Sequence, residues 1–244
     1  MDKIKELEKM IDESNNIVAF TGAGVSTDSG LKDFRGKNGL YKEKTIYPAE
    51  YMLSNNCFYS NTELFYEYYK ENFNCLKTKP NITHKLFKKL EDIGKLKAII
   101  TQNIDGLHTK AGSKKVYEVH GTILKNYCLK CHKEYDAKYV FESSGIPKCK
   151  CGGIIKPHVV LYGESLPEKE FSSGLAAIKN ADMLIVAGSS LTVFPASSMI
   201  DYFHGKYLVI LNNDKTPYDN MADLVINDEL KDVSNNIIKD LKIK

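Results

Sequence analysis

Residues 17–35 read IVAFTGAGVSTDSGLKDFR, and the rest of the chain is best understood from this stretch outward. It begins with a short apolar segment typical of a buried strand and ends with a polar run, an aromatic residue and an arginine. Between them, Gly22 and Gly24 allow a sharp turn and a close approach of the backbone to a ligand. Free backbone N–H groups there, with a helix behind them, suit an anion. The stretch therefore predicts a strand followed by a loop that holds a pyrophosphate.

This loop differs from the dinucleotide fingerprint of dehydrogenases. The pattern G-x-G-x-x-G requires a glycine at position 27, where the sequence has Thr27. The acidic residue that should follow a second strand about 20 residues later is also missing. We interpret the loop as one that binds a dinucleotide for a purpose other than hydride transfer.

Short β-branched segments alternate with helical segments along much of the chain. Helical patterning covers 85–93, 171–180, 195–203 and 233–244. This alternation predicts an α/β fold with a doubly wound, Rossmann-like parallel sheet. The expected strands are 17–20, 98–101, 116–119, 183–187, 207–211 and 224–226.

Four of the six cysteines form a cluster with the spacing C-x2-C, seventeen residues, then C-x-C. Two close thiolate pairs at this separation can surround one tetrahedral ion, and four cysteines leave no coordination position open. Gly152 and Gly153 follow the second pair, as in a tight metal knuckle. The sequence therefore predicts one structural Zn²⁺ and no disulfide, with the ligands Cys128, Cys131, Cys149 and Cys151.

Two stretches interrupt the alternation of strands and helices. Residues 37–82 are rich in Tyr, Phe and Asn, and residues 123–156 contain the cysteine cluster. We expect both to be insertions that together form a second, smaller domain, the first a helical module and the second a zinc-binding module. The larger α/β domain, which carries the dinucleotide loop, would then comprise 1–36, 83–122 and 157–244.

Composition limits the location and the partners. The chain has 34 Lys and Arg against 31 Asp and Glu, a net charge of +3 that is too small to indicate a nucleic-acid partner. No apolar run approaches the roughly 20 residues of a membrane span. The N-terminal 16 residues are charged and lack the apolar core of a secretion signal. We therefore expect a cytoplasmic protein without a membrane partner.

Polar residues follow the expected strand 98–101. Asn103 and Asp105 alternate, so both side chains could face one ligand in the crevice at the carboxyl ends of the strands. Asp105 could accept the N–H groups of a carboxamide such as nicotinamide. An Asx-type turn closed by Asp105 and Gly106 explains the same residues equally well.

His120 directly follows the expected strand 116–119. An imidazole near neutral pKa can take a proton from a ribose hydroxyl. The alternative is a buried histidine bonded to the backbone, but the polar strand end at 102–105 favours the base. Turns after two later strands offer donors for phosphate or ribose, although each also fits an ordinary turn: Gly188, Ser189 and Ser190, and then Asn212 and Asn213.

The segment 159–162 has an extended, β-branched character. It could pair with a substrate peptide as an added strand. The pattern alone favours the simpler interpretation, another strand of the core.

Taken in order, these motifs resemble the sirtuin family of NAD-dependent protein deacylases. The resemblance extends over residues 6–237 and rests on the whole ordered set. The motifs are GAGVS at 22–26, SG at 29–30, DFR at 33–35, TQNID at 101–105, HG at 120–121, GSS at 188–190 and the four cysteines.

The resemblance implies that the protein removes acetyl or other short neutral acyl groups from lysines of a protein or peptide. NAD would be consumed, giving nicotinamide, O-acyl-ADP-ribose and the free lysine. His120 is implied as the general base, with Asn103 as a second catalytic residue. An ADP-ribosyltransferase or NAD hydrolase on the same scaffold is the first alternative, and a non-enzymatic NAD-sensing interaction module is the second.

The resemblance also implies two sets of binding residues. Those for NAD are Gly22, Ala23, Gly24, Ser26, Thr27, Asp33, Phe34, Arg35, Gln102, Asn103, Ile104, Asp105, Gly188, Ser189, Ser190, Asn212, Asn213 and Leu230. Those for the acylated peptide are His120, Val159, Val160, Leu161, Tyr162, Gly163, Glu164, Leu191 and Val193.

The chain departs from the family pattern at two informative positions. Lys32 stands where a proline usually precedes Asp33, so we expect a more flexible loop. Tyr69 stands where members that remove negatively charged acyl groups have the arginine of Tyr-x-x-Arg. This argues against a preference for succinyl or malonyl groups.

Overall fold

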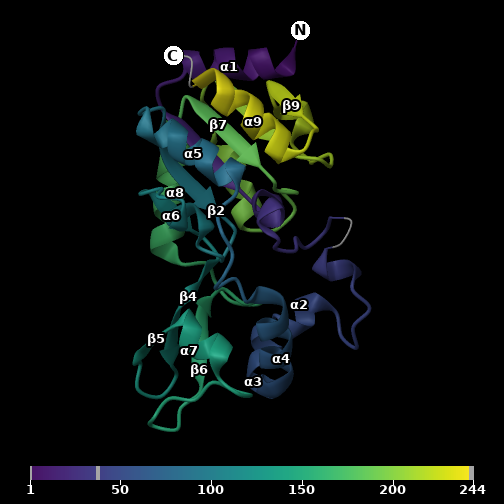
Figure 1. Ribbon diagram of the computed structural model, residues 1–244, viewed down its shortest axis with the longest axis vertical. Helices are drawn as coiled ribbons and strands as arrows, with labels where there is room; N and C mark the ends of the chain where they lie inside the picture. Colours follow the sequence, from purple (N-terminus) through teal and green to yellow (C-terminus); the bar gives the residue numbers. More distant parts are fainter. Residues whose placement is uncertain (1, 37–38, 242–244) are drawn as a thin grey trace.

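A parallel sheet forms the centre of the larger, upper lobe in the computed structural model, which describes residues 2–36 and 39–241 (Figure 1). The strands lie in the order β3-β2-β1-β7-β8-β9, and every neighbouring pair is parallel. The chain therefore builds outward from β1 in one direction and then returns to build in the other. The strands are β1 Ile17–Thr21, β2 Leu96–Thr101, β3 Val116–Glu118, β7 Met183–Ala187, β8 Tyr207–Leu211 and β9 Leu224–Ile226.

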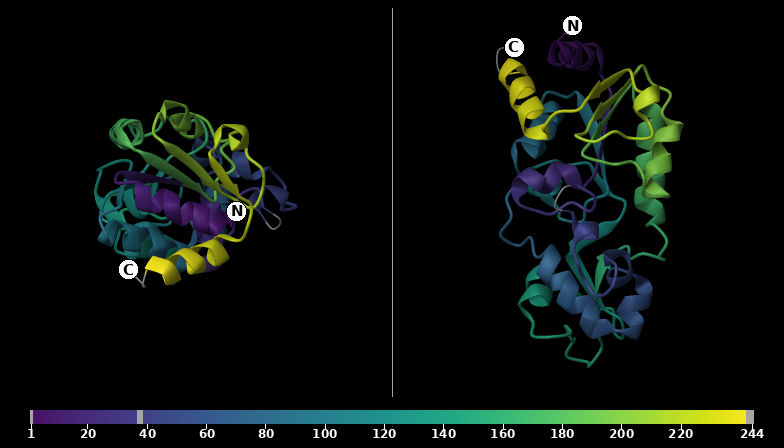
Figure 2. Two further views of the ribbon diagram at one scale, coloured as in Figure 1. Left: turned by 90° about the horizontal axis from the view of Figure 1, so that it is seen from above. Right: turned by 90° about the vertical axis from the view of Figure 1, so that its right-hand side faces the viewer.

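Helices cover both faces of this sheet (Figure 2). Ile17 and Ala19 of β1 face α1 Lys3–Glu13, α5 Ile82–Asp92 and α9 Leu230–Leu241. Val18 and Phe20 face the other way, toward α8 Glu168–Asn180 and the 3-10 helix η3 Ala196–Tyr202. The doubly wound parallel sheet is thus confirmed, and burial on both faces explains why its strands are continuously apolar.

Several helices differ from their predicted form, and α8 and α9 begin at Glu168 and Leu230, three residues earlier than predicted. Helix α5 begins at Ile82, three residues earlier than the helical pattern indicates, because the Asn81 side chain accepts the N–H groups of Thr83 and His84 and caps it. The segment predicted as a helix over 195–203 is the 3-10 helix η3. The Ser198 hydroxyl competes for a backbone carbonyl there, since its Oγ donates to Pro195 O at 2.8 Å.

The smaller, lower lobe combines a three-stranded antiparallel sheet with helices (Figure 1). Phe58 and Phe65 from the helices share one core with Ile123 and Ile155 from the sheet. The two insertions therefore pack together as one unit. Its elements are α2 Ala49–Met52, α3 Asn55–Ser60, α4 Thr62–Phe73, β4 Gly121–Cys128, β5 Glu134–Asp136, α7 Ala137–Glu142 and β6 Ile155–Val159.

The expectation of a core strand over 159–162 is wrong. Strand β6 ends at Val159 and pairs with β4 in the small sheet, outside the parallel sheet. Beyond it, Tyr162 forms a single parallel bridge with Ser54. A short run of β-branched residues reveals extended backbone, but it does not reveal which sheet the segment joins.

The remaining short elements lie in connections. They are η1 Ala23–Ser29, η2 Leu40–Lys42, α6 Leu107–Lys110 and η4 Asp219–Met221. None of the helices in the described parts of the chain is long and apolar enough to span a membrane.

Candidate functional site

A cavity of about 870 Å³ lies between the two lobes, at the carboxyl ends of the central strands. The loops after β1, β2, β7 and β8 line its upper wall, and residues of the lower lobe close it from below. The chain reverses its building direction between β1 and β7, and ligands of doubly wound sheets bind at such a switch point. All of the residues expected to bind NAD line this cavity.

The glycines after β1 and β7 bring two loops into contact. The Gly22 N–H donates to Ala187 O at 3.0 Å, and the Gly24 N–H donates to Gly188 O at 2.9 Å. Gly188 has φ +60°, and a Cβ there would lie 2.5 Å from Val25 N. The expectation that the N–H groups of Gly22 and Gly24 are free for an anion is therefore wrong. These glycines instead let the two loops pack closely.

Polar side chains after β2 connect the same loops. The Asn103 amide, which is 8% exposed, donates to Gly22 O at 3.0 Å and to Ser26 Oγ at 3.2 Å. Gln102 Nε2 donates to Ser189 Oγ at 2.8 Å, and this oxygen also accepts the Leu191 N–H at 3.2 Å. Because the Ser189 oxygen already accepts twice, its own proton is free to donate into the cavity.

Asp105 both closes the expected Asx-type turn and lines the cavity as a candidate ligand-binding residue. Its Oδ1 accepts the Leu107 N–H at 2.8 Å, which is the Asx-type turn. Its Oδ2 accepts the Ser26 hydroxyl at 2.7 Å, and the residue lines the cavity. Burial raises the pKa of Asp105, while the hydrogen bonds from Ser26 and Leu107 oppose the rise. The turn therefore presents the carboxyl group to the cavity.

His120 follows β3 and enters the cavity as a neutral imidazole. Its Nδ1 lies 3.0 Å from Gln102 O. A carbonyl oxygen only accepts, so Nδ1 carries the proton and Nε2 keeps its lone pair. Burial lowers the pKa of His120, and the Gln102 carbonyl partly opposes this. His120 is therefore bonded to the backbone through Nδ1, while Nε2 keeps the lone pair that a general base needs. Both interpretations of this residue from the sequence are compatible with the structure.

The polar run after η1 bends over the cavity through aromatic contacts. The Phe34 ring lies between Tyr41 and Phe73, with ring centroids 5.5 Å and 6.3 Å away. The Arg35 guanidinium lies 4.8 Å from the centre of the Tyr41 ring. These contacts hold Phe34 and Arg35 at the rim of the cavity.

Lys32 ties this loop to neighbouring segments. Its Nζ forms an ion pair with Glu43 at 2.5 Å and donates to Asn72 of α4 at 3.3 Å. The greater flexibility expected from the missing proline stays a prediction. Residues 37 and 38 of the same loop lie outside the described residues.

The expected peptide-binding residues line the cavity with one exception, Leu191. Its side chain is 2% exposed and packs in the core between the sheet and α8. A contact between Leu191 and the peptide stays a prediction, and it would have to be made by the backbone, because the side chain is turned into the core.

Sequence reasoning singled out Tyr69 by its family position, but it did not predict that the helical module forms part of the cavity wall. Tyr69, Asn72, Phe73 and Cys75 all line it. The Tyr69 ring is 1% exposed and stacks on Phe73, and its hydroxyl has no hydrogen-bond partner in the described structure. The helical spacing of these aromatics was the available signal, but it indicates only a buried face and not what the face contacts.

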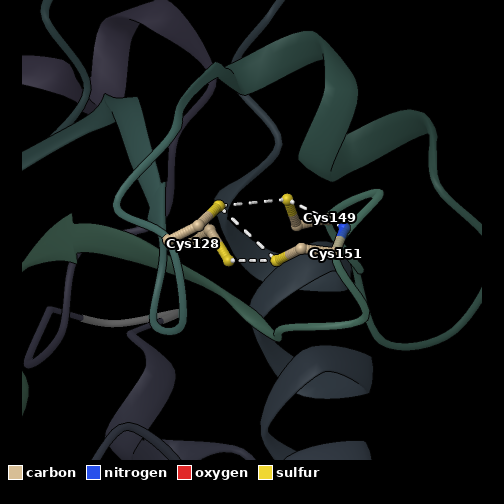
Figure 3. A group of neighbouring side chains, drawn as sticks. Cys128, Cys149 and Cys151 are labelled. Atoms are coloured by element: carbon tan, nitrogen blue, oxygen red, sulfur yellow. Dashed lines mark hydrogen bonds between the residues drawn. The ribbon is translucent and has the colours of Figure 1, made fainter.

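The four clustered cysteines converge at the end of the small sheet (Figure 3). Their sulfur atoms all lie within 4.8 Å of one another, and the pairs Cys128–Cys151, Cys131–Cys149 and Cys131–Cys151 are each 3.5 Å apart. Four sulfurs bound to one Zn²⁺ at about 2.3 Å would be separated by about 3.8 Å. A Cβ on Gly153 would lie 2.6 Å from Cys128 Sγ. The thiol set and its glycine turn therefore fit one zinc ion.

Comparison with known proteins gives consistent results. A profile of the Sir2 family matches residues 22–195. The chain is 52% identical to an NAD-dependent protein deacetylase of Clostridium acetobutylicum over 242 residues, covering 98% of this chain and 99% of the relative. A structure of Sir2 with a p53 peptide and NAD+ superposes with a TM-score of 0.88 at 38% identity, covering 99% of both chains. Sir2 bound to an acetylated peptide gives 0.87 at 37% identity, again covering 99% of both chains.

Proposed function

The chain belongs to the Sir2 family, and from this premise we propose that it is an NAD-dependent protein-lysine deacetylase. Its products would be nicotinamide, O-acyl-ADP-ribose and the free lysine. The observation that carries the proposal is His120, whose Nε2 has no hydrogen-bond partner among the described residues and lies in a cavity built at the switch point of a doubly wound sheet.

The residues of the upper wall suit NAD. In this reaction NAD supplies the ribose carbon C1′, to which the acyl oxygen bonds as nicotinamide departs. The Ser189 hydroxyl and the turn at Ser190 would donate to a phosphate or a ribose. Asp105 would accept the amide of nicotinamide beside Ile104. Asn212, Asn213 and Leu230 would contact the adenosine end.

His120 would act as the general base on a ribose hydroxyl. Its lowered pKa keeps the imidazole neutral at pH 7, so Nε2 can take the proton without first losing one. Asn103 holds Ser26 and the glycine loop in place beside it. Phe34 would cover the reacting carbon from the rim.

The acylated peptide would bind against residues 159–164 and Val193. We name residues 160–163 the peptide-binding segment. The backbone of Tyr162 is already paired with the helical module, from its N–H to Leu53 O at 3.1 Å and from the Asn55 N–H to its carbonyl at 3.0 Å. A substrate strand would therefore pair with backbone groups of the segment other than those of Tyr162.

The acyl group would be short and neutral. The stacked rings of Tyr69 and Phe73 form the wall that the helical module contributes, and Tyr69 brings no positive charge to pair with a carboxylate. We expect acetyl and propionyl peptides to react far faster than succinyl peptides. Mass spectrometry of the products from an acyl-peptide panel measures this preference.

We further propose a cytoplasmic location, no membrane or nucleic-acid partner, and the division into an NAD-binding domain, a helical module and a zinc module given above. The shared core of the two insertions supports treating them as one smaller domain.

The test compares nicotinamide release by the wild type and by His120→Ala, with and without an acetyl-lysine peptide. The wild type should release nicotinamide only with the peptide. His120→Ala should lose turnover by about 10²-fold or more, because the base is gone. It should still bind NAD, since the cofactor loops do not depend on the imidazole.

Three results would contradict parts of this proposal. Release without the peptide would favour an NAD hydrolase or ADP-ribosyltransferase. Binding of NAD with no release under either condition would favour a sensing module. Full turnover by His120→Ala would remove the role assigned to that histidine.

A further inference from the structure

Lys156 in β6 and Glu164 after the peptide-binding segment form an ion pair inside the lower lobe. Lys156 is only 4% exposed, and its Nζ lies 3.1 Å from Glu164 Oε2. The same Nζ lies 3.4 Å from Val159 O and 5.9 Å from the centre of the Phe58 ring. A lysine this deeply buried is rare unless its charge is paired.

Both oxygens of the Glu164 carboxylate are already occupied by the protein itself. Oε1 accepts the Asn55 side-chain amide at 2.9 Å, and Oε2 accepts the Leu161 N–H at 3.0 Å in addition to Lys156. The Glu164 N–H in turn donates to Leu161 O at 2.9 Å. Glu164 lines the cavity, but its charge is directed inward and not toward a substrate.

Electrostatics agrees with this inward role. Burial acts to raise the pKa of Glu164, but the Leu161 N–H, the Asn55 amide and Lys156 together hold the pKa below its usual range. The carboxylate is therefore charged at neutral pH and keeps all three contacts.

Stability alone does not explain such a pair. An apolar pair of similar volume often stabilises a fold as well as a buried ion pair does, because both charges must first be removed from water. Unlike an apolar side chain, the carboxylate makes directional hydrogen bonds. It joins β6, the start of α3 and the backbone of the peptide-binding segment at one point, and within the described residues its hydrogen bonds reach none of the loops after β1, β7 and β8.

We infer that the Lys156–Glu164 ion pair is a positioning device that holds the peptide-binding segment in its substrate-ready conformation and acts on peptide affinity, not on NAD binding. The inference rests on the proposed function, because it assumes that residues 160–163 receive the acylated peptide. It assigns Lys156 a role and changes that of Glu164 from a substrate contact to a positioning residue.

The experiment measures kcat and both KM values for Lys156→Met, Glu164→Gln and Lys156→Arg. Glu164→Gln keeps the shape of the side chain, removes its charge and replaces one acceptor oxygen with an NH2 donor, so it tests the pair even if Lys156→Met folds poorly. We expect KM for the acetyl peptide to rise about tenfold in the first two variants, while KM for NAD changes by less than about twofold. Lys156→Arg keeps a cation at this position, and its peptide KM should stay within about threefold of the wild type.

A matched control removes an exposed ion pair from the same module. Lys138→Met breaks the Lys138–Glu142 pair, whose side chains are 69% and 62% exposed, and should leave both KM values unchanged. A peptide KM that stays within about twofold of the wild type in Glu164→Gln, or a parallel rise in both KM values, overturns the inference alone. Absence of peptide-dependent nicotinamide release by the wild type overturns the proposed function and the inference with it.

Discussion

Single residues decide how closely the two cofactor loops approach. Gly188 combines a left-handed φ of +60° with backbone contacts that leave no space for a side chain. Gly94, at the end of α5, has φ +75° but nothing within 4 Å of its Cβ position. The two glycines therefore separate the cost of an unusual φ from the cost of crowding.

Gly188→Ala should weaken NAD binding by at least about tenfold and destabilise the protein by about 3 kcal/mol or more, because the new methyl group forces the loops apart. Gly94→Ala should cost only about 1 kcal/mol and leave NAD binding unchanged. Calorimetric titration with NAD and urea unfolding measure both effects. Equal effects of the two substitutions would show that loop contact at Gly188 is unimportant.

At the scale of elements, α5 and α6 are joined by two buried histidines. His84 and His108 are 0% and 2% exposed, and their ring centroids lie 4.8 Å apart. His108 Nε2 lies 3.0 Å from Thr21 Oγ1 at the end of β1. Asn81, which caps α5, also donates to Val25 O at 2.7 Å. These contacts of α5 and α6 with Thr21 and Val25 therefore support the glycine loop on the side away from the cavity.

The two histidines predict a loss of stability in mild acid. Burial lowers the pKa of His84 to about 4, and burial together with His84 lowers that of His108 well below its usual value. Below the unfolded pKa of about 6.5, the unfolded chain binds protons that the folded chain excludes, so stability falls as the pH falls. From pH 7.5 to 5.5, His84 alone should cost about 1.4 kcal/mol.

His84→Gln should remove this share of the pH dependence, because glutamine does not titrate. Urea unfolding at the two pH values measures the difference. The same pH dependence in His84→Gln and the wild type would contradict the assignment.

At the scale of the whole molecule, the lower lobe depends on the cysteine cluster. Strand β4 runs from the floor of the cavity to Cys128, and β6 runs back from the cluster to the peptide-binding segment (Figure 1). Loss of the metal should therefore reach the peptide side of the cavity through both strands. The upper sheet has its own two cores and should persist.

Purified protein should contain one zinc ion per chain. Cys151→Ala should abolish zinc binding, lower Tm by about 10 °C or more and eliminate peptide-dependent turnover, because metal binding contributes directly to folding. Cys57→Ala, in the same core but outside the cluster, should retain zinc and most activity. Metal analysis and thermal melts measure these outcomes, and an unchanged Tm in Cys151→Ala would exclude a structural role for the metal.

Local sequence patterns determined the parallel sheet, the cysteine cluster and the strand-end positions of Asp105 and His120. Those predictions succeeded because they depend on periodicity and spacing within short stretches. Strand β4 and the true place of β6 were not predicted, since a strand's partner is a long-range property. The same limit applies to Tyr69 and Phe73, whose spacing indicates burial but not a cavity wall.

The sequence by itself determined which residues are candidates for the chemistry: the glycine loop, the polar strand ends, the histidine and the four thiols. Only the tertiary structure decided how they are used. It occupied the N–H groups of Gly22 and Gly24 with the loop after β7, turned Leu191 into the core and directed Glu164 toward Lys156. The physical reason is that each hydrogen bond and each buried charge needs a partner, and these partners come from distant parts of the chain.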